Sequence, residues 1–398
     1  MPVSFLLFEA CDFVGFPAGG QLTMARHIMS AFAGDVALVG IDTDGSAPIG
    51  TWCTRRIDGV EYPFFAIRRR TPSAARPLVP ARIATAAALI RHRRGILSLG
   101  IRRAFCQGHE TMLAIAGWPW ESLAYDFPGV ANPLGISRYP WARPLAAAFD
   151  RVFFQALSRA DAVLATADQA AIAAMCERSA GRLTSAGVTV WPTRVDTTIF
   201  HPGDAVAARQ ATGLPHDKVL IVTSGRLNWV KGWPLLLEAL AGSDPRWHLV
   251  FVGDGEDRAA LLGRSEALGV ADRVTVTGFK PPREVAWHIQ AADVFAMASH
   301  HEGFSTSMLE ALACCKPIVS TAVSSATTIV ETGRTGFIVG TRDAGAFRDA
   351  LRRAIDLDAV DVRSRCADRV SAYAVANVHD DLCRVWPGLR PRAASPQL

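Results

Sequence analysis

His301-Glu302-Gly303-Phe304-Ser305-Thr306-Ser307-Met308-Leu309-Glu310-Ala311 is the most informative stretch of the chain. Glu302 lies in a glycine-containing loop, and Glu310 follows eight residues later on a predicted helix. Ser305 is a suitable N-cap residue, so the backbone N–H groups from Ser305 to Met308 would face an anion bound at the helix start. The two carboxylates can accept hydrogen bonds from the hydroxyl groups of a sugar attached to that anion.

Two cations lie about 70 residues upstream, in Ser224-Gly225-Arg226-Leu227-Asn228-Trp229-Val230-Lys231-Gly232. Arg226 follows a predicted strand at 219–223, and Lys231 stands at the start of the next predicted helix. An arginine grips two oxygens of a diphosphate, whereas a lysine acts as a point charge. Ligands of an open parallel sheet bind beyond the carboxyl ends of its strands. Both segments follow such strands, so we predict a shared site for a nucleotide-diphosphate sugar.

Apolar strands alternate with helical segments along the whole chain. This alternation predicts the α/β class, with parallel sheets that have helices on both faces. The polar, proline-bracketed segment 192–203 interrupts the pattern and is the best candidate for a linker. We expect two doubly wound, Rossmann-like domains facing a cleft: an acceptor-binding domain at 1–200 and a nucleotide-sugar-binding domain at 201–373. A C-terminal helix and tail at 374–398 should pack back on the first domain.

The individual elements follow from the same pattern. Strands are predicted at 3–8, 36–41, 122–125, 162–166, 188–191, 219–223, 248–252, 274–277, 294–296, 318–320 and 336–339. Helices are predicted at 19–32, 81–94, 143–159, 233–241 and 257–268, and helical patterning returns from 343 to about 386.

Composition sets broad limits on the class of protein. A chain of 398 residues, half of them apolar, can bury two cores. The eight cysteines form no CxxC pair, which argues against zinc and dithiol sites. Residues 1–9 have no basic region and resemble a first strand rather than a signal peptide. We therefore expect a cytoplasmic protein, with any membrane contact peripheral and at the inner face of the cytoplasmic membrane.

Arginines gather in one part of the first half. No acidic residue occurs from Tyr62 to His109, yet the segment holds Arg68, Arg69, Arg70, Arg76, Arg82, Arg91, Arg93, Arg94, Arg102 and Arg103. Three interpretations stay open at this point: a solvated surface, a patch for anionic lipid, or a site for a phosphorylated acceptor. Nucleic acid is not expected, because no nucleic-acid-binding motif accompanies the arginines.

Other classes of function compete with sugar transfer. The sequence Asp42-Thr43-Asp44-Gly45 follows a strand and mimics a metal-binding Asp-x-Asp. A nicotinamide dehydrogenase would need G-x-G-x-x-G after the first strand, but Pro17 stands where the helix should begin. A sugar-nucleotide epimerase and a non-catalytic sugar-nucleotide-binding protein remain as alternatives.

The motifs of the second half resemble those of the retaining glycosyltransferases with the GT-B fold, the "group 1" family related to glycogen synthases. The resemblance is strongest over 218–340. It includes Gly225-Arg226-Leu227 with Lys231-Gly232, Gly253-Asp254-Gly255, Thr277-Gly278-Phe279, Ala292-Asp293-Val294, the E-x7-E pair and Thr335-Gly336-Phe337. In the first half, Gly19-Gly20, Ala160-Asp161-Ala162-Val163 and Val195-Asp196 look like weaker landmarks of the family.

The resemblance implies roles for the matching residues. Arg226 and Lys231 would bind the donor pyrophosphate, Glu310 the nucleotide ribose, and Glu302 the transferred sugar. The implied donor site comprises Gly19, Gly20, Gly225, Arg226, Lys231, Glu302, Gly303, Phe304, Ser305, Thr306 and Glu310. The reaction would move a hexose-type sugar to a glycan or lipid-linked acceptor in cell-envelope or exopolysaccharide synthesis, retain the anomeric configuration and need no metal or other cofactor.

The acceptor side is less well defined. His109-Glu110 resembles a His-Glu segment on the first-domain side of the family's cleft. His109 is either a structural histidine or a group near the reacting sugar, and in the second case it joins Glu302, Arg226 and Lys231 as a candidate catalytic residue. Tyr125-Asp126 takes the place of a His-Asp pair and gives two further acceptor-side candidates. The aromatic stretch from Trp118 to Trp141 either stacks on sugars or packs in the core. Cys315 and Ser324-Ser325 stand where the family often has glycines, in loops that line the cleft. The donor preference of any one relative therefore cannot be assigned to this chain.

Overall fold

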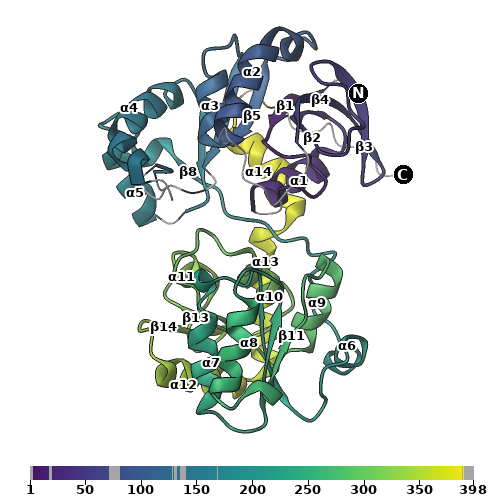
Figure 1. Cartoon of the computed structure of the whole chain (residues 1–398), viewed down its shortest axis with the longest axis vertical. Coiled ribbons are helices and arrows are strands. Elements are labelled where there is room, and N and C mark those ends of the chain that lie inside the picture. Colours follow the sequence, from purple (N-terminus) through teal and green to yellow (C-terminus); the bar gives the residue numbers. More distant parts are fainter. Residues whose placement is uncertain are drawn as a thin grey trace. The chain divides into compact units, whose positions relative to one another are not determined.

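The computed structural model describes residues 3–17, 20–70, 81–127, 129, 132–134, 140–167, 169–387 and 389. Figure 1 shows the path of the chain through two compact units. Unit 1 comprises Met1–Pro192 together with Ala376–Leu398, and unit 2 comprises Thr193–Val375. The chain therefore passes from unit 1 to unit 2 beside Pro192 and returns beside Ala376.

Unit 1 is built on one sheet with the strand order β3-β4-β2-β1-β5-β6-β7-β8. All neighbouring strands are parallel except β3 and β4, which form an antiparallel hairpin. The strands are β1 (Phe5–Phe8), β2 (Val36–Asp42), β3 (Trp52–Ile57), β4 (Val60–Arg69), β5 (Arg103–Gln107), β6 (Ser122–Phe127), β7 (Ala162–Ala165) and β8 (Thr189–Val190).

Helices cover both faces of this sheet because its central strands are apolar on both sides. In β1, Leu6 and Phe8 join one core cluster, and Phe5 and Leu7 join the other. The first cluster is covered by α2 (Ala81–Leu97), α3 (His109–Ile115), α4 (Ala146–Leu157) and α5 (Gln169–Arg178). The second is covered by α1 (Gly20–Phe32) and α14 (Val378–Val385). Unit 1 is thus a three-layered α/β domain.

The last helix of the chain belongs to the core of unit 1. Trp386, directly after α14, has no exposed surface, and its ring lies edge-on to Phe5 with 5.2 Å between centroids. Its indole Nε1 donates a hydrogen bond to Ser122 Oγ at 2.8 Å. The segment after Val375 therefore completes unit 1 by burying a large aromatic side chain that also has its polar atom satisfied.

Unit 2 repeats the architecture with a six-stranded, entirely parallel sheet in the order β11-β10-β9-β12-β13-β14. The strands are β9 (Val219–Ser224), β10 (Trp247–Val252), β11 (Val274–Val276), β12 (Val294–Met297), β13 (Ile318–Thr321) and β14 (Gly336–Val339). The helices are α6 (Ala205–Thr212), α7 (Trp233–Ala241), α8 (Arg258–Ala267), α9 (Pro282–Ala291), α10 (Thr306–Ala313), α11 (Ala326–Ile329), α12 (Ala344–Ile355) and α13 (Ala359–Val370).

The two sides of the unit 2 sheet also have separate cores. Leu220 and Val222 of β9 pack with α9 and α10, whereas Ile221 packs with α7 and α12. This alternation is the period of two expected for a strand that is buried on both faces. The prediction of an α/β fold with two parallel-sheet domains is confirmed.

Several elements of unit 1 differ from the sequence-based expectation. The hairpin β3–β4 and the central strand β5 were not predicted, and most of β4 and all of β5 lie in the arginine-rich part. The helix expected at 143–159 begins as a 3-10 turn at Pro140–Leu145 and becomes α-helical only from Ala146. None of the helices in the described part of the chain has the length and apolar character needed to span a bilayer.

Candidate functional site

A cleft in unit 2 lies beyond the carboxyl ends of its central strands. Its lining includes Ser224, Gly225, Arg226, Lys231, Ser299 and Ser307. Ser224 ends β9, and Ser299 follows β12, the strand paired with β9. Ser307 lies in the first turn of α10. The loops after two neighbouring strands and the start of a helix therefore converge on one hollow, as expected for an open parallel sheet.

Lys231 and Glu302 form an ion pair at this cleft. Lys231 Nζ lies 2.6 Å from Glu302 Oε1, and Ser299 Oγ donates a hydrogen bond to the same oxygen at 2.6 Å. The Glu302 side chain is 12% exposed and that of Lys231 is 36% exposed, so the carboxylate is largely shielded from water while the lysine still reaches solvent. Two donors therefore hold one carboxylate oxygen, and this arrangement fixes the position of the carboxylate.

Arg226 is the exposed cation of the cleft. Its side chain forms no ion pair with any residue that the structure describes, although it lines the same hollow as Lys231. The loop that carries it is held by backbone bonds from Gly225 N–H to Val252 and from Leu227 N–H to Asp254. A guanidinium on a fixed loop is free to bind an anion in a bidentate manner.

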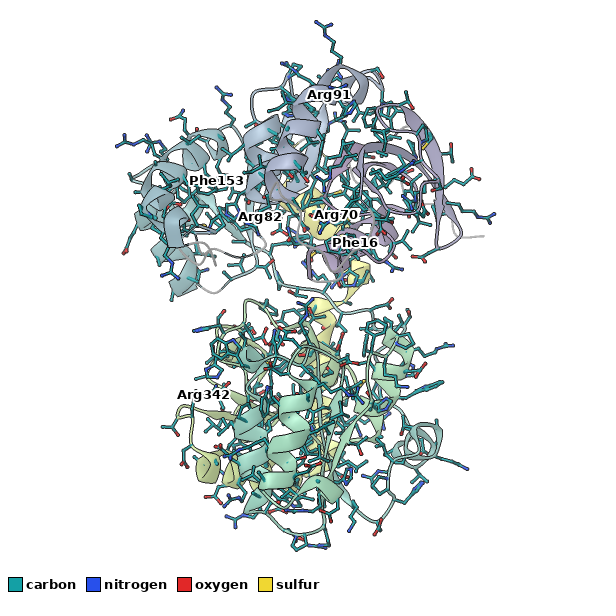
Figure 2. All side chains as sticks on the ribbon, in the orientation of Figure 1. Phe16, Arg70, Arg82, Arg91, Phe153 and Arg342 are labelled. Carbon is teal, nitrogen blue, oxygen red and sulfur yellow. The ribbon has the colours of Figure 1, made fainter. Side chains whose placement is uncertain are left out.

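Gly232 makes the close approach of two loops possible. It has φ +70°, and a Cβ atom there would lie 1.8 Å from the carbonyl oxygen of Ala298. Arg342 approaches from the other side and donates to the carbonyl oxygens of Ala298 and Ser299 at 2.9 and 3.1 Å. Figure 2 labels Arg342 in unit 2. The loop that carries Lys231 and the segment that carries Ser299 are therefore locked together.

The start of α10 differs in detail from the expectation. Ser305 is the N-cap, and its Oγ accepts from the Met308 N–H at 3.3 Å. The Ser305 N–H itself donates to Ser325 Oγ at 3.1 Å. Two of the four amides predicted to face an anion are thus already bonded within the protein. The N–H groups of Thr306 and Ser307 have no acceptor among the described residues, and they are the ones available to a ligand.

Glu310 lies one turn after Ser307, on the same face of α10. Although the residue keeps some exposed surface, its carboxyl is surrounded by protein, and this desolvation raises its pKa from 4.5 to about 8. Glu310 is not among the residues lining the small hollow itself. Arg226 and Lys231 thus share one cleft, Glu302 is bonded to Lys231, and Glu310 flanks the cleft from the helix.

The remaining predicted donor residues divide into three groups. Gly303 and Phe304 precede α10 and have their carbonyl oxygens bound by Ser324 Oγ and Thr193 Oγ1, each at 3.0 Å. Gly20 is the first residue of α1 in unit 1, so it belongs to a different unit from the cleft. Gly19 lies outside the described residues.

Unit 1 contains a second and larger cavity of about 420 Å³. Its lining comes from the ends of β1 and β4, the loop before α1, the first turn of α2 and the start of α3. The ionisable residues of this lining are Glu9, Arg68, Arg70, Arg82, His109 and Glu110.

His109 lines this cavity and is otherwise enclosed by aromatic rings. Its ring centroid lies 4.6 Å from that of Phe153 and 6.0 Å from that of Phe127. Desolvation, and to a smaller extent the charge of Arg82, lowers the pKa of His109 from 6.5 to about 4. The imidazole is therefore neutral at physiological pH, which allows it to bind a hydroxyl group but makes it a weak base.

The other acceptor-side candidates lie deeper than predicted. Tyr125 has no exposed surface, is part of the core, and does not line the cavity. Burial raises the pKa of its hydroxyl well above the usual value, so it cannot serve as a base near neutral pH. Asp126 is 2% exposed, and burial raises the pKa of its carboxyl. Both residues lie behind the cavity wall rather than on it.

Packing describes part of two alternatives left open by the sequence, because Tyr139 and the side chain of Trp141 lie outside the described residues. Trp118 and Trp120 stack on each other with 5.7 Å between centroids, and Trp118 belongs to the core, as do Tyr125 and Phe127. Asp42 is fully buried, and its Oδ2 accepts from Arg69 Nε at 2.7 Å and from the Gly45 N–H at 3.1 Å. Asp42 is thus bonded within the protein, and Asp44, whose side chain is 56% exposed, lies 3.2 Å from Arg55.

Sequence reasoning did not single out two residues that line these sites. Glu9 directly follows the buried strand β1, and Ser299 follows the buried strand β12. Both lie where ligands of parallel sheets bind. Glu9 and Ser299 could have been found from the sequence, because each is a polar residue just after a fully apolar strand.

Comparison with known proteins agrees with this geometry. Residues 205–371 match the family described as glycosyl transferases group 1. A D-inositol 3-phosphate glycosyltransferase from Stackebrandtia nassauensis is 34% identical over 227 residues, which cover 53% of this chain and 51% of that protein. The chain therefore spans about half the length of this curated relative.

Two solved structures share the fold over nearly the whole chain. Sucrose-phosphate synthase from Thermosynechococcus elongatus has a TM-score of 0.76 at 21% identity and covers 96% of this chain and 98% of its own. The Anabaena protein HepE in complex with UDP-glucose has a TM-score of 0.68 at 18% identity, with the same coverage. Residues 205–371 thus match the glycosyl transferases group 1 family, and the chain has the GT-B fold of two parallel-sheet α/β domains.

Proposed function

We propose that the chain is a retaining glycosyltransferase that moves a hexose-type sugar from a nucleotide-diphosphate donor to a hydroxyl group of a glycan or lipid-linked acceptor. The observation that carries the proposal is the unit 2 cleft, where Arg226 and Lys231 line one hollow and Glu302 is bonded to Lys231 at 2.6 Å. The family match covers this part of the chain, and structural neighbours are complexes with UDP-glucose and with UDP-2-fluoro glucose.

Each charged group of the cleft has a role in donor binding. Arg226 binds two oxygens of the pyrophosphate, and Lys231 binds a third as a point charge. The N–H groups of Thr306 and Ser307 point their dipoles at the same anion. Glu310, on α10, accepts hydrogen bonds from the hydroxyl groups of the ribose. Glu302, already oriented by Ser299 Oγ, faces the sugar at the other end of the donor.

The chemical step is a displacement at the anomeric carbon. The bond from this carbon to the leaving phosphate oxygen breaks, and a bond to the acceptor oxygen forms on the same face. The acceptor proton passes to the departing phosphate oxygen, so no protein base is needed. The protein contributes by holding both substrates and by stabilising the charge that develops on the diphosphate.

Metal independence is part of the proposal. The diphosphate leaves with additional negative charge, and the side chains of Arg226 and Lys231 together with the helix-start amides of Thr306 and Ser307 offer donors to it. In a partly dry cleft such fixed donors stabilise a developing anion strongly. Transfer should therefore continue in the presence of EDTA, and a requirement for added Mg²⁺ or Mn²⁺ would refute this part of the proposal.

The proposal extends to cell-envelope or exopolysaccharide synthesis at the inner face of the cytoplasmic membrane. Its support is the outer face of α2, where Ile83 and Ile90 are 60% and 61% exposed. Arg91 and Arg94 are exposed on the same helix, and Figure 2 shows Arg91 projecting from unit 1. Exposed cations attract a helix to an anionic membrane surface, and the two exposed isoleucines beside them can add apolar contact.

The test begins with donor turnover. A panel of nucleotide-diphosphate sugars that starts with UDP-glucose is incubated with bacterial membrane and glycan extracts, and release of free nucleoside diphosphate is measured. Replacement of Arg226 or of Glu310 by alanine should abolish release while the fold is retained. Binding without release would indicate a non-catalytic binding protein, and the anomeric coupling constant in the product spectrum would report retention or inversion.

A further inference from the structure

Three arginines line the unit 1 cavity without a carboxylate partner among the residues that the structure describes. Arg68 and Arg70 come from the end of β4, and Arg82 comes from the first turn of α2. Their neighbour Arg69, whose side chain points to the other side of the strand, is instead bonded to Asp42 at 2.7 Å. Figure 2 labels Arg70 and Arg82 in the same part of unit 1. Arg69 thus has the carboxylate partner that the three cavity arginines lack among the described residues.

Three guanidinium groups around one hollow repel each other. Arg68 Nε is buried and has no hydrogen-bond partner among the described residues. Burial and the charge of Arg70 both lower the pKa of Arg68. The surroundings therefore disfavour the charged form of Arg68. Arg70 lies over the ring of Phe16 with 4.9 Å to the centroid, and this contact fixes its direction without neutralising it. A bound anion would remove the repulsion.

The lining of the cavity also offers a buried group for hydroxyls, and two more buried polar groups lie nearby without lining it. Glu9 is 7% exposed, its Oε1 accepts from the Ala10 N–H at 2.9 Å, and its Oε2 has no partner in the described part of the chain. The strand register puts Gln107 opposite Asp126, next to the end of β1. Gln107 Nε2 and Asp126 Oδ1 are likewise buried without a described partner.

Buried polar atoms are nearly always hydrogen-bonded in folded proteins. Glu9 lines the cavity, so its Oε2 atom without a described partner indicates that this part of the lining is completed by a polar group from a ligand or by water, whereas Gln107 and Asp126 do not line the cavity. Burial raises the pKa of Glu9 to about 8, so its carboxyl is mostly protonated at neutral pH and can both donate and accept. With His109 neutral as well, the cavity carries three positive side chains against the one negative charge of Glu110.

We infer that the unit 1 cavity binds an acceptor that carries both a phosphate group and several hydroxyl groups. Arg68, Arg70 and Arg82 surround the phosphate, and Glu9 with His109 contacts the hydroxyls. A volume of about 420 Å³ is more than a phosphate ion needs and fits a phosphorylated hexose or cyclic polyol. The inference rests on the proposed function, because it names the acceptor class for that transfer.

The phosphate can belong to a soluble sugar phosphate or to the headgroup of a lipid, and binding experiments separate these sources. Saturation-transfer difference NMR is recorded with glucose 6-phosphate and myo-inositol 1-phosphate, and with glucose and myo-inositol as parents without phosphate. Sedimentation is measured with phosphatidylcholine vesicles that contain or lack phosphatidylinositol. The proteins are wild type, the double variant Arg70→Gln/Arg82→Gln, Arg226→Gln, and Arg151→Gln as a matched control on the exposed side of α4.

We expect at least one phosphorylated probe or the phosphatidylinositol vesicles to bind wild type, and the parents and plain vesicles to bind at least tenfold more weakly. The double variant should weaken the phosphate-dependent binding by about tenfold or more for each arginine removed. Arg151→Gln and Arg226→Gln should leave it unchanged, the latter because Arg226 belongs to the donor cleft. Circular dichroism and thermal unfolding of the double variant show whether it is folded.

Other outcomes would overturn the inference. Equal binding of parents and phosphorylated probes, binding insensitive to the double variant, or loss of binding in Arg226→Gln would each contradict a phosphate site in unit 1. UDP binding is measured in parallel. If UDP binds and depends on Arg226 while no phosphate probe responds, the acceptor inference fails alone. If UDP does not bind at all, the proposed function fails.

Discussion

Lys231 Nζ and Glu302 Oε1 lie 2.6 Å apart, so the cation expected to bind the pyrophosphate is already paired with the carboxylate expected to contact the sugar. A donor must therefore draw the ammonium away from Glu302 or share it. If the proposed roles hold, we expect this competition to lower the affinity for the nucleotide and to leave an oriented carboxylate for the sugar when Lys231 turns to the phosphate. Ser299 Oγ keeps that carboxylate in place during the exchange.

The ion pair between Lys231 and Glu302 predicts opposite changes in UDP affinity when one or the other residue is replaced. Glu302→Gln keeps the hydrogen bond from Ser299 but releases Lys231, so UDP should bind several-fold more tightly while sugar transfer falls by about 10²–10³. Lys231→Met should weaken UDP binding and transfer together. Calorimetric titration with UDP and initial rates of UDP release are the measurements. Arg352→Gln, on the exposed face of α12, is the control, and weaker UDP binding by Glu302→Gln would contradict the competition.

Glu310 makes stability depend on pH. Desolvation raises its pKa from 4.5 to about 8 in the folded protein. A raised pKa means that its contribution to stability is complete below pH 4.5 and is lost as the pH rises through 8. Glu310→Gln should therefore raise the free energy of unfolding of unit 2 at about pH 8 by an amount on the order of a few kcal/mol, with no gain near pH 4.5. Denaturant unfolding at both pH values tests this, and donor turnover should be lost at either.

Gly232 and Gly263 form a matched pair for testing the loop contact. Gly232→Ala places a methyl group 1.8 Å from the Ala298 carbonyl oxygen at a positive φ, so it should destabilise unit 2 by about 2 kcal/mol or more and reduce donor binding. Gly263 lies in α8, where an added methyl group would meet no atom within 4 Å, and Gly263→Ala should stabilise the helix by about 0.5–1 kcal/mol. Equal effects in thermal unfolding would contradict the close contact between the two loops.

Trp386 anchors the end of the chain in unit 1. Trp386→Ala removes a fully buried ring and should destabilise unit 1 by about 3–5 kcal/mol, whereas Trp386→Phe keeps most of the packing and loses chiefly the bond to Ser122. Trp287, which is 39% exposed, serves as the control, and Trp287→Ala should have a much smaller effect. Urea unfolding followed by circular dichroism distinguishes these cases.

Membrane contact through α2 predicts a dependence on charge and salt. Wild type should sediment with anionic vesicles at low salt, and Arg91→Gln/Arg94→Gln should lose most of this binding, at roughly 1 kcal/mol for each charge near the surface. High salt should have the same effect as the double variant. A wild-type protein that stays in the supernatant with anionic vesicles at low salt would refute the membrane part of the proposed function.

The fold of unit 2 could be predicted from the sequence because its signals are local. The strands 219–224 and 294–297 are short apolar runs, and α7 and β14 have the predicted bounds. Ser305 caps α10 as its residue type suggested. In unit 1 the strands β4 and β5 were missed because arginines at their ends hid short apolar centres. Only long-range pairing with β2, β1 and β6 makes those residues strands.

The unit 1 cavity was not predictable for a related reason. Glu9, Arg68 and Arg82 are far apart in sequence, and their convergence depends on the order of the sheet and on the direction of α2. The arginine-rich segment also does not act as one patch. Arg69 is paired with Asp42, and Arg102 is bonded to the carbonyl of Leu97, so composition alone could not separate structural arginines from those facing the cavity.

The return of the chain to unit 1 after Val375 has a consequence for biosynthesis. A ribosome releases the segment 193–375 before it releases α14 and Trp386, so unit 2 can reach its native state while unit 1 still lacks part of its interior. In the nascent first unit, Phe5 and its neighbours lack a packing partner until Trp386 is synthesised. Newly made protein is therefore most vulnerable to aggregation and proteolysis in the half that is synthesised first.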